Sequence, residues 1–138
     1  MGWFDKYKNG NSITEPLFIL LPVKPITKKN SRRWAPIGKT GIWKLIPSEA
    51  YEQYERDCGL FIRCKGLNIS CPVNMRVIFY IDSDRESDIS NYFEAVADML
   101  VHYQVLADDN RKIVVSWDGS RVYVDRKNPR TEITIEPL

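Results

Sequence analysis

Eight carboxylates lie between Asp82 and Asp109, in a stretch that contains one arginine and no lysine. Three parts of this stretch stand out: Asp88 followed by Asn91, the pair Glu94 and Asp98, and the pair Asp108 and Asp109. Carboxylates crowded into one small domain repel one another, and a divalent cation with oxygen ligands relieves that repulsion. The acidic stretch therefore predicts a metal site.

Residues 24–44, the basic arm, hold seven lysines and arginines and no acid. Trp34 and Trp43 are interleaved with these cations. Cations mixed with aromatic side chains are typical of a nucleic-acid surface, on which flexible lysines make salt-sensitive contacts to phosphates. A metal site and a surface for a polyanion in the same domain point to phosphodiester chemistry.

Each of these features also has an interpretation without a ligand. Asp88 fits a helix N-cap, and Asp108 with Asp109 fits a turn. Glu94 and Asp98 fit a solvated helix face, since charged helix faces are common. The basic arm fits a solvated loop equally well. Spacing alone leaves these alternatives open.

The chain has 138 residues and a net charge of +2, so we expect one globular domain in which charge is segregated rather than in excess. Residues 1–13 are predicted to form a loose N-terminal segment that precedes the first strand. No apolar run approaches the ~20 residues that span a bilayer and nothing resembles a signal peptide, so we expect a cytoplasmic protein without a membrane partner. The three cysteines lack the spacing of a zinc site and are expected to be reduced thiols.

The predicted elements are those of an α+β domain, a mixed β-sheet covered by two α-helices. Ser48 is the expected N-cap of the first helix and Gly66 its stop, and Asp118-Gly119 predicts a hairpin turn. Strands are predicted over 17–21, 41–46, 73–81, 112–117, 121–124 and 131–135, helices over 48–66 and 88–103, and a loop over the basic arm to residue 40.

In the second predicted helix the apolar residues share one arc, and Asn91, Glu94 and Asp98 fall together on the opposite side. Asp88 lies where this helix begins, and Asp109 lies just before the next strand. A helix start and a strand start can be adjacent at one end of a sheet. We therefore expect Asp88 and Asp109 to converge on a common cation.

Several ordered segments of the chain resemble one known family. They are Leu21-Pro22 with Pro25, Thr27-Lys28-Lys29-Asn30-Ser31, Asp88-Ile89-Ser90-Asn91, Asp98 with Leu100, and Asp108-Asp109. This set resembles the RusA-type Holliday junction resolvases, which are common in phage and prophage replication modules. The resemblance implies a RusA-like homodimeric endodeoxyribonuclease that uses Mg²⁺, or Mn²⁺ in its place. Such an enzyme resolves four-way DNA junctions by paired nicks in recombination and repair, in the cytoplasm of a bacterial host.

By position, the resemblance implies that Asp88 is the first catalytic aspartate and Asp109 the last. Asp108 is then a further acidic metal ligand, and Asn91 is the asparagine that follows the motif. The basic arm would supply the DNA-binding residues, which are Lys28, Lys29, Asn30, Arg32, Arg33 and Lys39.

Two positions depart from the family pattern. Ser90 stands where the family has its second aspartate, and Glu94 stands where it has a lysine. A serine hydroxyl is a poor magnesium ligand compared with an anionic oxygen. We hypothesise that Glu94 replaces the lost carboxylate as the third metal-binding and catalytic acid, with Asp98 in a supporting role. Two other functions stay open: a catalytically silent protein of the same fold that binds branched DNA, and a protein-interaction domain.

Overall fold

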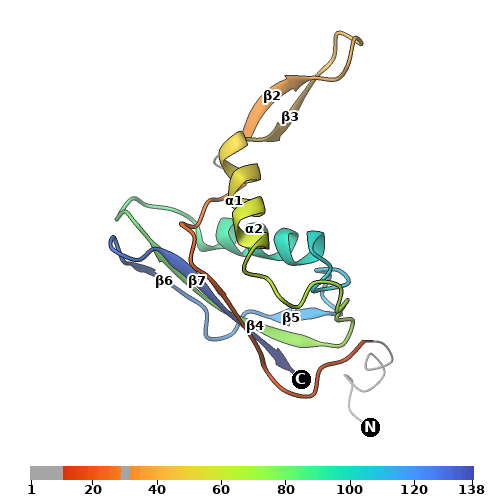
Figure 1. The fold of residues 1–138 in the computed structure, drawn as a ribbon, viewed down its shortest axis with the longest axis vertical. Helices are drawn as coiled ribbons and strands as arrows, with labels where there is room; N and C mark the ends of the chain where they lie inside the picture. The colour runs from red at the N-terminus through yellow and green to blue at the C-terminus, as the bar shows by residue number, and fades with distance from the viewer. Residues whose placement is uncertain (1–10, 29–31) are drawn as a thin grey trace.

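The computed structural model describes residues 11–28 and 32–138, and it has two helices over one face of a sheet (Figure 1). The predicted α+β class with a mixed sheet is confirmed. The elements are β1 Leu17–Leu21, β2 Arg32–Pro36, β3 Trp43–Pro47, α1 Glu49–Gly59, β4 Val73–Ile81, α2 Ile89–His102, β5 Val114–Ser116, β6 Arg121–Val124 and β7 Arg130–Pro137.

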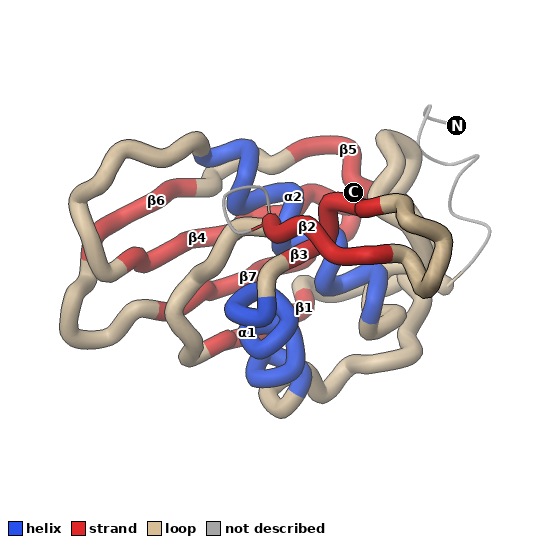
Figure 2. The backbone as a smooth tube through the Cα atoms, turned by 90° about the horizontal axis from the view of Figure 1, so that it is seen from above, coloured by secondary structure: helices blue, strands red, loops and turns tan. Residues whose placement is uncertain are grey.

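The five-stranded sheet is built around β4 and β7. β7 pairs antiparallel with β1 on one side and with β4 on the other, while β5 and β6 both pair parallel with the far edge of β4. Viewed from above, both helices lie over the same face of this sheet (Figure 2). The predicted strands 17–21 and 73–81 have the bounds that the structure gives them.

The core lies between this face and the helices. Val73, Met75, Val77 and Phe79 alternate along β4 and are all buried, as their period of two predicts. Burial of each such side chain stabilises the fold by about 1.5–3 kcal/mol. Among the described helices, none is long and apolar enough to cross a bilayer.

The predicted hairpin at Asp118-Gly119 is wrong. The chain turns there, but β6 continues along the same edge of β4 as β5 and in the same direction. The side chain of Asn74 fills the gap between the two strands: its Oδ1 accepts from the Asp118 amide at 2.8 Å and from Ser116 Oγ at 2.6 Å. Its Nδ2 donates to the Asp118 carbonyl at 3.1 Å. Asn74, which is distant in sequence, thus holds the turn so that β5 and β6 follow one another along the same edge of β4 and do not pair with each other.

The loop predicted to residue 40 is wrong at residues 32–36, which form β2, whereas the strand predicted over 41–46 overlaps β3. β2 and β3 form an antiparallel hairpin that projects from the start of α1, clear of the sheet (Figure 1). Gly38 and Gly41 supply the left-handed residues that its turn requires, with φ of 52° and 74°. Thr40 Oγ1 donates to the Ile37 carbonyl at 2.7 Å and accepts from the Ile42 amide at 3.2 Å.

Helix α1 starts as predicted but ends earlier. Ser48 accepts a hydrogen bond from the Tyr51 amide at 3.2 Å and caps the helix. The last helical residue is Gly59 rather than a residue next to Gly66. Tyr103 packs against Gly59, where any Cβ would collide with the phenol, and its hydroxyl donates to the Glu55 carbonyl at 2.7 Å. This tertiary contact occupies the end of the helix.

Candidate active site

The acids of α2 differ in their environments. Asp88 is the N-cap residue and is exposed, and its side chain makes no capping hydrogen bond. Glu94 is exposed as well, whereas Asp98 is half-buried. Asn91 is buried, although it was expected on the open side of the helix with these acids. The reason is that α1 packs on this side: the Tyr51 hydroxyl donates to the Ala95 carbonyl at 3.4 Å.

Asp98 is the point at which the basic arm meets the acidic helix. Lys28 Nζ lies 3.4 Å from Asp98 Oδ2, and each of these two side chains is about one-third exposed, at 35% and 34%. The same ammonium lies 5.7 Å from the centre of the Tyr51 ring. Burial raises the pKa of Tyr51, and the negative charges of Glu55, Asp98 and Glu94 raise it further. Tyr51 of α1 therefore stands close to the acidic side of α2.

Asp108 and Asp109 occupy a turn after α2 but behave differently. Asp108 Oδ2 accepts from Asn110 Nδ2 at 2.9 Å and its Oδ1 from the Asp109 amide at 2.8 Å, and these bonds lower the pKa of Asp108. The pKa of Asp109 is raised, first by partial burial of its carboxylate and then by the charges of Asp108 and Asp98. Asp108 organises the turn, and the Asp109 carboxylate faces other negative charge.

Of the effects that raise the pKa of Asp109, the charge of Asp98 on α2 is the smallest, after burial and Asp108. Within residues 11–28 and 32–138, however, no three acidic, histidine or cysteine side chains stand close enough together to hold a metal ion by themselves. The predicted sharing of one cation by Asp88 and Asp109 stays a prediction.

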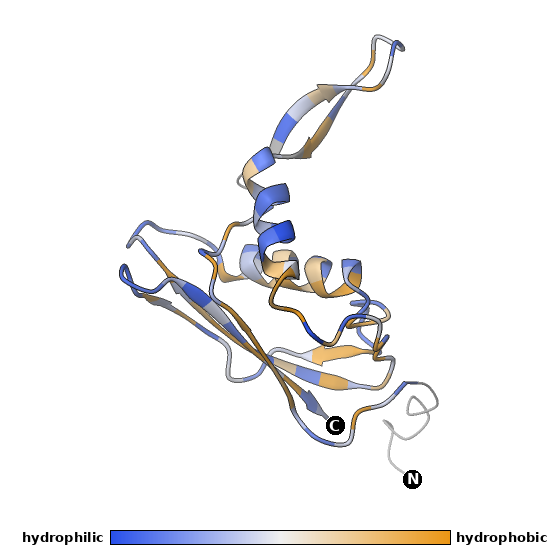
Figure 3. Cartoon of the chain, in the orientation of Figure 1, coloured by the Kyte–Doolittle hydropathy of each residue, from blue (hydrophilic) through white to orange (hydrophobic). Residues whose placement is uncertain are grey.

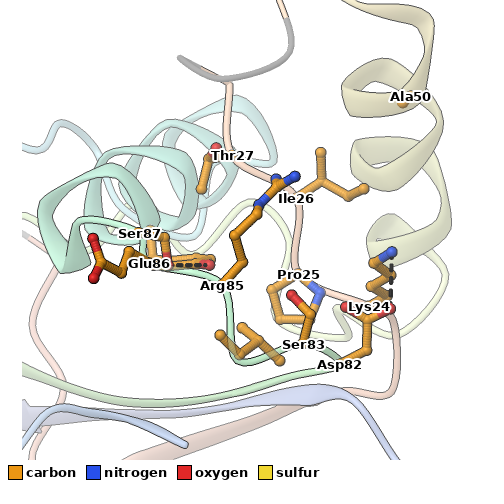
Figure 4. Close-up of a pocket in the computed structure, with 12 residues that line it drawn as sticks. Lys24, Pro25, Ile26, Thr27, Ala50, Asp82, Ser83, Arg85, Glu86 and Ser87 are labelled. Atoms are coloured by element: carbon orange, nitrogen blue, oxygen red, sulfur yellow. Dashed lines mark hydrogen bonds and ion pairs between the residues drawn. The ribbon is translucent and has the colours of Figure 1, made fainter. Parts of the chain in front are cut away.

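A pocket of about 400 Å³ lies beside the start of α2. It is bounded by the first residues of the basic arm, the start of α1 and the loop 82–87. In Figure 4, Arg85 reaches across this pocket toward Ile26 and Thr27. Lys24 Nζ pairs with Asp82 Oδ2 at 2.9 Å, and this pairing lowers the pKa of Asp82. Two cations, Lys24 and Arg85, therefore line this pocket.

The match to known protein families decides what this arrangement belongs to. Residues 22–136 match the family model of the endodeoxyribonuclease RusA, which covers most of the chain. The chain belongs to the RusA family. It is therefore an endodeoxyribonuclease of the Holliday junction resolvase type, a hydrolase of a family that is generally metal-dependent. A comparison with curated proteins gives no significant match.

The DNA-binding residues predicted for this RusA family member fall in three environments. Lys28 is paired with Asp98 near the acids. Arg33 and Lys39 are exposed on the hairpin. Lys29 and Asn30 lie outside the described residues, and of Arg32 only the backbone, in β2, is described.

The supporting role that the sequence predicts for Asp98 in this RusA site stays a prediction. Sequence reasoning missed the position of Tyr51 beside the acids of α2. The available signal was the spacing of Asn91, Ala95 and Asp98, which places a small residue between two polar ones on one helix face. A small residue there lets another helix approach closely.

Proposed function

We propose that this RusA family member cleaves four-way junctions by Mg²⁺-dependent phosphodiester hydrolysis, with Asp98 and Asp109 as the central carboxylates and Glu94 as the third. What supports this pairing is that burial and the neighbouring Asp108 raise the pKa of Asp109, and that Asp98 adds a smaller effect in the same direction. Glu94 lies one helical turn before Asp98, on the same side of α2, and is exposed.

The donor set suits magnesium in its chemistry. Mg²⁺ in proteins is commonly bound by one or two carboxylates together with substrate phosphates and water, and seldom by a cage built from protein alone. When bound, the ion would lower the pKa of its water ligand and place positive charge beside the phosphate. Mn²⁺ accepts the same oxygen ligands. The carboxylates orient the attacking water, and nearby cations stabilise the charge that develops on the phosphate.

A second arrangement of the same function uses Asp88 in place of Asp98, as the resemblance to the family implies. Ten residues separate these acids along α2, which is about 15 Å along the helix axis. One ion cannot bind to both of them, so Asp109 shares a ligand set with one or the other. Asp98 is placed first because its charge is among the effects that raise the pKa of Asp109, although it is the smallest of them.

The remaining parts of the proposal concern partners and setting. Lys28, Arg33 and Lys39 contact strand backbones, with salt-sensitive affinity. Paired nicks across a symmetric junction need two active sites, so we propose a homodimer with two-fold symmetry. The enzyme would act on recombination intermediates in the cytoplasm of a bacterial host, as expected for a phage or prophage protein.

A synthetic four-way junction tests this function. The wild-type chain is incubated with it in Mg²⁺ or in EDTA, binding is read by gel shift and cleavage by product sizing. We expect binding in both conditions and paired nicks in Mg²⁺ alone. Asp109→Asn should bind and not cleave. Binding without cleavage in either Mg²⁺ or Mn²⁺ would instead support the silent junction-binding protein, and neither activity would support an interaction domain.

A further inference from the structure

The β2–β3 hairpin presents an apolar face that nothing in the described chain covers. Trp34 is 65% exposed and Trp43 is 60% exposed. The strand register sets Trp34 opposite Leu45 and Trp43 opposite Pro36. Because side chains two apart in a strand share a face, these four residues form one surface, which we call the tryptophan face. Figure 3 shows hydrophobic segments on this hairpin, far from the core.

The opposite face of the hairpin carries charge. Arg33 and Lys44 lie there, opposite Ile46 and Ala35 respectively, and Lys39 is in the turn. No acid occurs anywhere between residues 24 and 48. A surface that joins exposed indoles to cations without any acid is complementary to a polyanion with flat apolar groups, which describes a nucleic acid.

The tip of the hairpin is a hydrogen-bonded turn with an exposed isoleucine at each end. The Ile37 amide donates to the Ile42 carbonyl at 2.8 Å, and Thr40 bridges the same two residues. Ile37 and Ile42 are 44% and 59% exposed. Apolar side chains on a hydrogen-bonded scaffold are the kind of wedge that proteins insert between base steps of DNA.

We propose that the tryptophan face stacks on bases at the branch point of the junction, and so lets the enzyme distinguish branched from linear DNA. The proposal rests on the junction binding described above. At a branch point, adjacent base pairs are easily unstacked, which exposes the face of a base. Inside a linear duplex, each base face is covered by the next base pair. Stacking on Trp34 and Trp43 therefore contributes at a branch, and the hairpin cations contribute on any DNA.

A second copy of the chain is the other occupant to consider for this face. The exposed apolar residues Leu60 and Phe61 at the end of α1 would be a candidate partner surface. Arg63 and Lys65 follow them directly. Docking of the cationic hairpin there would bring like charges together, so the charge pattern favours DNA.

The test uses junctions with the fluorescent base 2-aminopurine at the branch point, or eight base pairs away from it, and a matched linear duplex. All measurements are made in EDTA, so cleavage plays no part. With the wild-type chain we expect a fluorescence change at the branch-point probe only. Trp34→Ala and Trp43→Ala should abolish that change and weaken junction binding about tenfold each, with little effect on the duplex. Trp34→Phe and Trp43→Phe should keep most of the preference.

One control separates stacking from other effects. Lys39→Ala with Lys44→Ala should weaken junction and duplex binding alike. If the double lysine variant loses as much junction preference as Trp34→Ala, or if both tryptophan variants keep it, the stacking role is wrong. A tryptophan variant that changes the sedimentation mass without DNA would point to the second copy. A wild-type chain without junction preference would overturn the proposed function itself.

Discussion

Lys28 and Asp98 are 70 residues apart in the chain, and their side chains meet at 3.4 Å. This contact joins the basic arm to the acidic side of α2. It places a lysine ammonium on an oxygen that, in the proposed function, binds Mg²⁺. The two cations would compete for that oxygen, and this competition is open to measurement.

Replacement of Lys28 by methionine should lower the Mg²⁺ concentration at half-maximal cleavage. A partly exposed ion pair contributes up to about 1 kcal/mol, so we expect a shift of about two- to fivefold at saturating DNA. Lys24→Met is the matched control, since Lys24 pairs with Asp82 and not with Asp98. Equal midpoints in wild type and Lys28→Met would show that Asp98 is not a ligand.

Glu94→Gln tests whether Glu94 substitutes for the carboxylate that is missing at Ser90. The change keeps the size of the side chain and removes its charge. We expect cleavage to fall about tenfold or more at limiting Mg²⁺, while junction binding in EDTA is kept because like charge near the DNA is reduced. Ser90→Ala is the control and should cleave as wild type does. Unchanged Mg²⁺ dependence in Glu94→Gln would remove Glu94 from the site.

Asn74→Ala should destabilise the fold by about 2–3 kcal/mol, because three hydrogen bonds are lost and the backbone of Asp118 loses both of its partners. Ser116→Ala removes one of these bonds and should cost about 1 kcal/mol. Urea unfolding measures both values. Equal stabilities of the two variants would show that the link between β5 and β6 does not depend on Asn74.

Cys58 should be inert to alkylation in the native state. Burial raises the pKa of Cys58 to about 12, so the thiol stays protonated at neutral pH. At pH 8 only roughly one molecule in ten thousand then carries the thiolate. Mass spectrometry after iodoacetamide treatment should find Cys58 unmodified until urea unfolds the chain. Rapid modification of native Cys58 would contradict its burial between α1 and the core.

Local sequence patterns predicted those elements that local rules control. Alternation in 73–81 and the Ser48 cap gave a strand and a helix start that the structure confirms. The errors came from contacts distant in sequence. Asp118-Gly119 is a good hairpin signal, but Asn74 binds its backbone and keeps the chain on one edge of β4. Propensity within the turn carries no information about that side chain.

The candidate site was predicted in the same uneven way. The acids were found from their density, and the family was identified from their order. The pairing of Lys28 with Asp98 was not predicted, because it depends on how the arm passes over α2. A strand close to β3 was predicted, but its partner β2 was missed, because the two strands stabilise each other through Trp34 opposite Leu45 and not through a core.

Binding of a divalent cation to the chain tests most directly whether carboxylates from α2 and from the following turn share one ion. Mn²⁺ binding is followed by electron paramagnetic resonance, in the presence of an uncleavable junction, for Asp98→Asn, Asp109→Asn and the double variant, with Asp88→Asn alongside. If Asp98 and Asp109 hold the same ion, each single variant loses most of the affinity and the double variant loses little more. Additive losses would contradict the account, as would full affinity in Asp98→Asn together with a loss in Asp88→Asn.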